Sequence, residues 1–145
     1  MNETFIPVNE YGKKKWYLID CKEQQLGRLA SIVVLILSGK LKSYYHPAMD
    51  LGDYVILINA DYINLNRNIE RFHVFKPGRP GQSLKKLINS SSYQIVERCI
   101  FGMMPNCLAR RHLSKRLKIY PKLNHPHFAQ KPTQINDLNN FKSHL

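Results

Sequence analysis

The sequence has few cysteines, and their number and spacing exclude two classes of small protein. Cys21, Cys99 and Cys107 are an odd number of thiols and form no CxxC pair. They argue against a disulfide framework and against a four-thiolate zinc site, and they suit a reducing compartment. A catalytic thiol at Cys99 or Cys107 is the alternative, but Cys99 lies on the apolar face of an expected helix, which favours inert packing.

Long apolar runs are also absent. The longest spans residues 32–37, and a helix needs roughly 20 apolar residues to cross a bilayer. The first twenty residues hold no apolar segment and carry Glu3 and Glu10, unlike a signal or transit peptide. We expect a protein that works where it is made, or one whose targeting segment has been removed.

Acidic residues are scarce, and one long segment has none. The 145-residue chain carries 22 Lys and Arg against 10 Asp and Glu, which gives a formal net charge of +12. Residues 98–136 contain no carboxylate side chain but hold eight of the basic residues. Because like charges repel one another in a folded chain, this balance predicts an anionic partner.

A phosphate-binding glycine loop is missing as well. Gly27 stands alone before its expected helix, and the Gly78–Gly81 segment opens no helix. Asp50 and Asp53 have the spacing of a carboxylate pair, which is one requirement of acid–base catalysis. Gly52 lies between them, however, and favours a turn in which these carboxylates cap or bond the backbone.

His125 and His127 form a His-Pro-His sequence that resembles a pair of metal ligands. Neither Cys nor a carboxylate lies near them at the spacing of a third and fourth ligand, so a metal site is disfavoured. We therefore expect no metal, no cofactor and no small-molecule substrate, and we expect that the chain is not an enzyme.

Hydrophobic patterns predict an α/β fold. Strands are expected at Trp16–Asp20 and Tyr54–Ile58, which are short and rich in aromatic or branched residues. The second strand has no apolar–polar alternation, as in parallel sheets that are covered on both faces. Between them, Leu26–Ser38 has the length and apolar character of a buried helix, and Gly39 stands where helices commonly end. Strand, helix and strand at this spacing indicate a crossover unit.

The C-terminal half is expected to add two helices and an irregular tail. Amphipathic spacing favours a helix at Tyr93–Met103 and a second from Leu108 to Tyr120. Three prolines after residue 120 exclude a long helix there. We expect one domain, divided into an N-terminal arm at 1–15, an α/β core at 16–120 and a C-terminal extension at 121–145.

The expected 108–120 helix has two opposed faces. Its apolar stripe comprises Ala109, Leu113, Leu117 and Tyr120. Its basic ridge comprises Arg111, Lys115 and Lys118, with Arg110 and Arg116 at the flanks. A solvated face usually mixes charges of both signs, so we interpret this ridge as a surface that contacts nucleic acid. A membrane surface is the alternative, although the ridge lacks a large aromatic side chain.

A series of short motifs runs in order from about residue 16 to residue 132. In the first half they are Trp16–Asp20, Leu26–Ala30, Gly39-Lys40-x-Lys42, Tyr45-x-Pro47, Asp50-x-Gly52-Asp53-Tyr54-Val55-Ile56 and Asn59-Ala60. In the second half they are Gly102–Pro105, Leu108-x-Arg110, Leu117-x-Ile119-Tyr120 and His125-Pro126-His127-x-Ala129-Gln130-x-Pro132. Together they resemble the universal large-subunit ribosomal protein thirteen family, in its bacterial or plastid type.

The resemblance implies a three-layer α/β fold with a small, mainly parallel sheet flanked by helices. It implies a structural constituent of the large ribosomal subunit that binds large-subunit rRNA, contacts neighbouring large-subunit proteins and supports assembly. A basic RNA-binding protein that acts outside the ribosome is the alternative. The Asn-, Ile- and Lys-rich composition, together with loops that diverge from the usual bacterial ones, favours a plastid (chloroplast stroma) ribosome over a bacterial cytoplasm.

The residues expected to bind RNA fall into three groups. The expected phosphate contacts on the ridge are Arg110, Arg111, Lys115, Arg116 and Lys118. Further expected contacts are Arg28, Lys40, Lys42 and Arg79. Stacking or hydrogen bonding to RNA is expected of Tyr45, His125 and His127. Arg28 has an equally weighted alternative as the ion-pair partner of an acidic neighbour.

Overall fold

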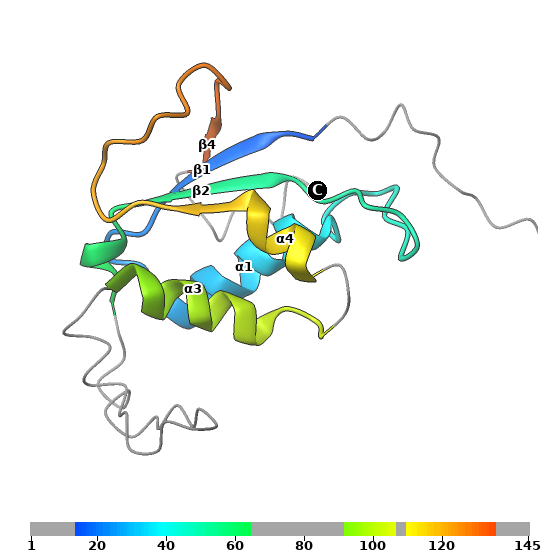
Figure 1. Ribbon diagram of the computed structural model, residues 1–145, viewed down its shortest axis with the longest axis horizontal. Helices are drawn as coiled ribbons and strands as arrows, with labels where there is room; N and C mark the ends of the chain where they lie inside the picture. Colours follow the sequence, from blue (N-terminus) through cyan, green and yellow to red (C-terminus); the bar gives the residue numbers. More distant parts are fainter. Residues whose placement is uncertain (1–13, 65–91, 107–109, 136–145) are drawn as a thin grey trace, which may run out of the picture.

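The computed structural model describes residues 14–64, 92–106 and 110–135. Its elements are β1 (Trp16–Asp20), α1 (Leu26–Ser38), β2 (Tyr54–Ile58), the 3-10 helix η2 (Ala60–Tyr62), α3 (Ser92–Met103), α4 (Arg110–Arg116), β3 (Leu117–Ile119) and β4 (Thr133–Ile135). Figure 1 shows the strands as one sheet with the helices packed beside it. The predicted α/β class is confirmed.

The sheet contains four parallel strands in the order β3-β2-β1-β4. In the central pair, Trp16 of β1 lies opposite Tyr54 of β2. Side chains alternate along each strand, so these two rings share one face of the sheet while Val55 and Leu57 share the other. The expectation of a small, mainly parallel sheet is confirmed.

The two faces of the sheet have different covers. In Figure 1, α1, α3 and α4 lie below the sheet, and the loop between β3 and β4 passes above it. The connections from β1 to β2 and from β2 to β3 move across the sheet in one direction, whereas the connection to β4 returns. Connections between parallel strands have one handedness, so a connection that runs back across the sheet must lie on the opposite face from the others. The prolines of residues 121–132 explain why this return crossover is a loop.

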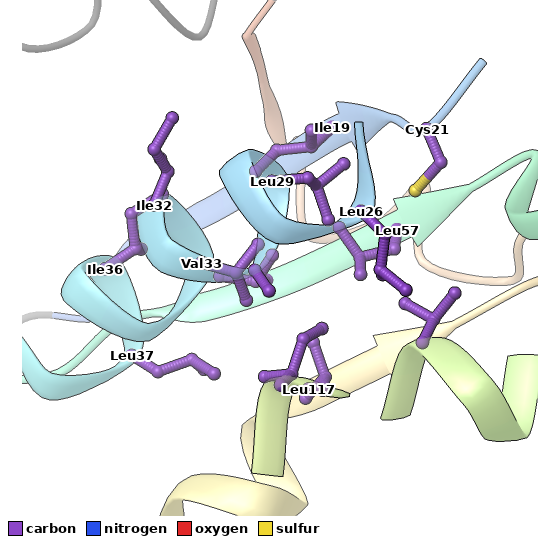
Figure 2. Packing of buried hydrophobic residues seen from close by; sticks show 14 of the residues in the cluster. Ile19, Cys21, Leu26, Leu29, Ile32, Val33, Ile36, Leu37, Leu57 and Leu117 are labelled. Carbon is purple, nitrogen blue, oxygen red and sulfur yellow. The ribbon is translucent and has the colours of Figure 1, made fainter. Parts of the chain in front are cut away.

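The core lies between the sheet and α1. Leu29 and Val33 of α1 are fully buried against Ile19 of β1 and Leu57 of β2, as Figure 2 shows. Their positions at i and i+4 explain why the 26–38 run forms a helix with one face on the sheet. Leu113 and Leu117 complete the same cluster from α4 and β3, so both expected burials are confirmed.

A tight contact at the C-terminal end of α1 fixes the loop that precedes β2. Gly39 adopts φ +74°, and the amides of Gly39 and Lys40 each donate at 3.1 Å to carbonyls of the last turn of α1. A Cβ on Gly39 would lie 2.8 Å from the Leu51 backbone, and a Cβ on Gly52 would collide with the Leu37 carbonyl. Gly39 therefore ends α1 as expected, and Gly52 permits the close approach of the loop.

The predicted helix from Leu108 to Tyr120 is wrong at its C-terminal end. Residues 107–109 lie outside the described residues, α4 ends at Arg116, and Leu117–Ile119 form β3 beside β2. Leu113 and Leu117 have helical spacing, but Leu117 and Ile119 also alternate with Lys118 as in a strand. Pairing with β2 decides between these two patterns, and it cannot be read from local sequence.

The segment that was assigned to the C-terminal extension also contributes to the sheet. Thr133–Ile135 form β4, which pairs with β1, and Ile135 is buried in the core cluster. The α/β core thus continues beyond residue 120, the boundary that the sequence suggested. A strand of this length has too few residues to show an alternation that identifies it.

Candidate nucleic-acid interface

Arg116 lies buried at the edge of the sheet where the strands begin, not on the outer ridge. Its guanidinium donates to both carboxylate oxygens of Asp50, with Nη1 2.6 Å from Oδ1, and Nη1 also lies 3.3 Å from the Gly52 carbonyl. Lys14 pairs with the same carboxylate at 3.0 Å. Hydrogen bonding to Arg116 is the main reason that the pKa of Asp50 is lowered from 3.8 to about 2. The expected surface position of Arg116 is therefore wrong.

Lys42 forms an ion pair with the neighbouring carboxylate, Asp53. Its ammonium lies 2.7 Å from Oδ1 of Asp53 and 2.8 Å from the Leu51 carbonyl. The same Asp53 oxygen accepts the backbone amide of Lys15 at 2.8 Å, just before β1. Asp53 therefore bonds the backbone as expected, but both carboxylates also hold cations, which the motif alone did not predict.

The exposed surface of α4 carries the basic side chains that lack such partners. Arg111 and Lys115 are exposed, and neither has a hydrogen-bond or ion-pair partner for its side chain in the described part of the chain. Arg110 is half-buried and donates to the Phe101 carbonyl at 2.6 Å. Leu113 is buried on the opposite side, so α4 does present Arg111 and Lys115 outward as predicted.

The loop after α1 adds two further expected residues to this region. Lys40 and Tyr45 are exposed, and the ion pair between Arg116 and Asp50 ties their loop to the end of α4. Arg28 lies on an exposed part of α1, about 15 Å along the helix from its last residue, Ser38, by the rise of an α-helix. It has no ion-pair partner among the described residues, which leaves its alternative role unsupported. Arg79 lies outside the described residues.

Lys118 lies on the other face of the sheet, and His127 belongs to the return loop that passes over that face. Lys118 is opposite Ile56 in register, on the face away from α1. The His127 ring shares a hydrogen bond of 2.9 Å with the Tyr120 hydroxyl and lies 5.4 Å from the Trp16 ring. Burial, followed by the nearby charge of Lys118, lowers the pKa of His127. Lys118 is thus separated from the basic side chains of α4 by the sheet.

His125 is buried in the same loop and is not available as a surface group. Its ring stacks against Phe128 with centroids 4.4 Å apart, while Phe128 itself is 72% exposed. His125 Nδ1 accepts the backbone amide of His127 at 3.2 Å. These contacts give both histidines intramolecular roles. The exposed position of Phe128 beside His125 was not predicted from the sequence.

Neither described cysteine has the character of a nucleophile. Burial raises the pKa of the Cys21 thiol to about 12 and raises that of Cys99, so both stay protonated near neutral pH. Cys99 packs against the core cluster, and Cys107 lies outside the described residues. Within the described ranges, no three His, Cys, Asp or Glu side chains are grouped to hold a metal ion. No helix in those ranges has the length and apolarity to span a membrane.

One signal in the sequence could have indicated that Asp50 and Asp53 form ion pairs. Only 10 carboxylates are distributed among 22 basic side chains, and two of them lie within the Asp50–Asp53 motif beside a glycine. In a chain with this imbalance, a carboxylate in a buried turn is expected to attract the nearest Lys or Arg. No comparable signal identifies the partner, because Asp50 and Arg116 are 66 residues apart.

Sequence comparisons find relatives along most of the chain. A family model described as ribosomal protein L13 matches residues 14–126. The large ribosomal subunit protein uL13c of Trieres chinensis is 50% identical over 137 residues, which cover 94% of this chain and 99% of the relative. The large ribosomal subunit proteins uL13 of Trichodesmium erythraeum and Crocosphaera subtropica are each 40% identical over 141 residues, with 93% of both chains covered.

The fold, the basic surface and these relatives define the class of this protein. It is a ribosomal protein, a structural component and not an enzyme. More particularly, the chain belongs to the ribosomal protein L13 family. The resemblance that the ordered motifs indicated is thereby confirmed.

Proposed function

We propose that this chain is a structural constituent of the large ribosomal subunit and binds its rRNA through a basic surface centred on α4. We further propose that this binding supports assembly of the subunit. Relatives named as large ribosomal subunit proteins over nearly the full length of the chain support the first part. The distribution of charge on the described residues supports the second.

One observation carries the proposal: the basic side chains divide into paired and unpaired groups. Arg116, Lys42 and Lys14 are held by Asp50 and Asp53 at the edge of the sheet. The exposed cations without such partners in the described chain include four that the sequence predicted as RNA contacts: Arg28, Lys40, Arg111 and Lys115. We assign phosphate contact to these four, because a cation already paired inside the protein cannot neutralise RNA without breaking its pair.

These residues would act in two ways: some would neutralise RNA phosphates, and others would hold the binding elements in position. Arg111 and Lys115 would lower the repulsion between phosphates where RNA segments approach α4, and each contact would release condensed counterions. Arg116 would act indirectly, since its pair with Asp50 holds α4 beside the loop that carries Lys40 and Tyr45. Lys118 and Arg79 are proposed as further contacts, with Lys118 on the opposite face of the sheet.

The proposed partners are large-subunit rRNA and neighbouring large-subunit proteins. A plastid ribosome is favoured by the likeness to uL13c of Trieres chinensis, and the likeness to cyanobacterial proteins suits a ribosome of bacterial type. A bacterial cytoplasm is the alternative location. The acid-free segment 98–136 agrees with rRNA as the partner, because polyanion binding needs no balancing carboxylate.

A pair of matched variants tests the proposed surface. Lys115→Ala and Lys22→Ala each remove one exposed positive charge, but Lys22 lies between Asp20 and Glu23 and away from α4. In a salt titration with large-subunit rRNA, Lys115→Ala should reduce the log–log slope by roughly 0.7–0.9, and Lys22→Ala should leave it nearly unchanged. Equal effects of the two variants would show that only net charge matters and would overturn the assignment.

A further inference from the structure

The return loop between β3 and β4 presents one aromatic ring to solvent on a fixed base. Phe128 is 72% exposed, the largest value among the exposed large apolar side chains of the described residues. One side of its ring stacks on His125 with an interplanar angle of 28°, and His125 is only 8% exposed. The exposed ring is therefore backed by a buried one, which fixes its orientation.

The backbone on either side of Phe128 is also held in place. His127 shares a hydrogen bond with the Tyr120 hydroxyl and lies against Trp16, so the residue before Phe128 is anchored to the sheet. The amide of Lys131 donates to the Phe128 carbonyl at 3.1 Å, which closes a four-residue turn after it. An aromatic ring that is ordered before binding loses less conformational entropy when a partner stacks on it.

The same turn carries a cation three residues after the ring. Residues i and i+3 of such a turn have Cα atoms within about 7 Å of each other, so the side chains of Phe128 and Lys131 leave the backbone close together. Lys131 is exposed, with φ +47°, and its side chain has no partner in the described chain. No carboxylate side chain occurs anywhere in residues 98–136.

We propose that Phe128 and Lys131 form a binding site for one unpaired nucleotide of RNA. The base stacks on the open side of the Phe128 ring, and the Lys131 ammonium contacts the attached phosphate. A nucleotide combines a flat apolar face with an adjacent negative charge, which matches an aromatic ring and a cation on one turn. This inference deepens the proposed function and rests on it, since rRNA is the source of the nucleotide.

The test compares two oligomers with the full-length chain. One is a twelve-nucleotide oligoadenylate, and the other is an abasic ribose-phosphate oligomer of equal length. Phe128→Ala should weaken oligoadenylate binding by roughly 5- to 150-fold, because stacking on an aromatic side chain contributes that much per base. The same variant should bind the abasic oligomer as the native chain does. Lys131→Ala should weaken binding of both and reduce the salt slope by roughly 0.7.

Three further variants separate stacking from apolar contact and from loss of structure. Phe128→Trp keeps an aromatic face and should retain oligoadenylate binding, whereas Phe128→Leu should lose it. Leu123→Ala removes another exposed apolar side chain, 62% exposed, from the same loop and should change neither affinity. Unchanged oligoadenylate affinity in Phe128→Ala would overturn the site and indicate a protein contact instead. An equal loss in Leu123→Ala would also overturn it, because the loss would then not depend on stacking at Phe128.

The outcomes also distinguish this site from the proposed function. If the native chain binds large-subunit rRNA with a steep salt dependence while Phe128→Ala changes nothing, the nucleotide site fails and the basic surface stands. If the native chain binds neither oligomer nor rRNA, both proposals fail.

Discussion

Arg116 and Asp50, 66 residues apart in the chain, form a two-point ion pair in which both terminal nitrogens of the guanidinium donate to the carboxylate. The pair fixes α4 against the loop that precedes β2. It also removes Arg116 from the set of cations that face solvent, since its side chain is only 7% exposed. Arg111 and Lys115, on the outer side of the same helix, remain for an anionic partner. One helix thus carries both a structural and a surface cation.

Replacing Arg116 and replacing Arg111 should have very different effects on the stability of the fold. Arg116→Ala should lower the free energy of unfolding by about 1–3 kcal/mol, because charge-assisted hydrogen bonds are lost and Asp50 keeps partial solvation. Arg111→Ala should change stability by no more than about 0.5 kcal/mol, as expected for a surface site. Urea unfolding of the two variants measures this difference, and equal destabilisation would show that Arg116 is not held as described.

The pair with Arg116 should also make stability depend on acid. The pKa of Asp50 is lowered from 3.8 in the free residue to about 2, chiefly by Arg116. The stabilisation is therefore complete above about pH 5 and is lost as the pH falls through the range between these two values. Urea unfolding midpoints measured at several pH values should show that the native chain is more stable than Asp50→Asn above this range and that the difference disappears within it. Parallel pH profiles for the two proteins would contradict the prediction.

Two glycines should respond in opposite ways to the addition of a methyl group. A Cβ on Gly52 would collide with the Leu37 carbonyl and crowd Arg116, whereas a Cβ on Gly27 would meet nothing within 4 Å. Gly52→Ala should therefore destabilise the fold by about 1–3 kcal/mol or more. Gly27→Ala, inside α1, should stabilise it by about 0.5–1 kcal/mol. Thermal unfolding of both variants is the measurement, and a tolerated Gly52→Ala would disprove the close approach.

The leucines of α4 and β3 should behave as core residues although they belong to different elements. Leu113→Ala and Leu117→Ala should each cost about 2–5 kcal/mol, because each leaves a cavity in the buried cluster. Leu123→Ala is the matched control, since Leu123 is 62% exposed. Denaturant unfolding should separate the first two variants from the third, and similar stabilities for all three would place the core elsewhere.

Local sequence was sufficient for the central crossover unit. The 26–38 helix, its terminal Gly39 and the strands at Trp16–Asp20 and Tyr54–Ile58 all lie where the patterns predicted. These segments have a strong local signal: a long apolar run, a left-handed glycine, or a concentration of branched and aromatic residues. Tyr93–Met103 was also correctly assigned to a helix, which begins one residue earlier at Ser92.

Short strands and ion-pair partners could not be predicted in the same way. β3 and β4 have only 3 residues each, and their identity depends on pairing with β2 and β1. The outward direction of Arg111 and Lys115 followed from helical spacing, which depends on neighbours in sequence. The burial of Arg116 depends on Asp50, a contact that only the folded chain creates.

Sedimentation with ribosomal subunits tests the central claim most directly. Tagged full-length chain, expressed in its source cells, would be followed through a sucrose gradient beside the Arg111→Ala/Lys115→Ala double variant. We expect the native chain to migrate with the large subunit and the double variant, although equally stable in urea, to shift toward the free protein fractions. A native chain that binds RNA but never migrates with the large subunit would instead be an RNA-binding protein that acts outside the ribosome.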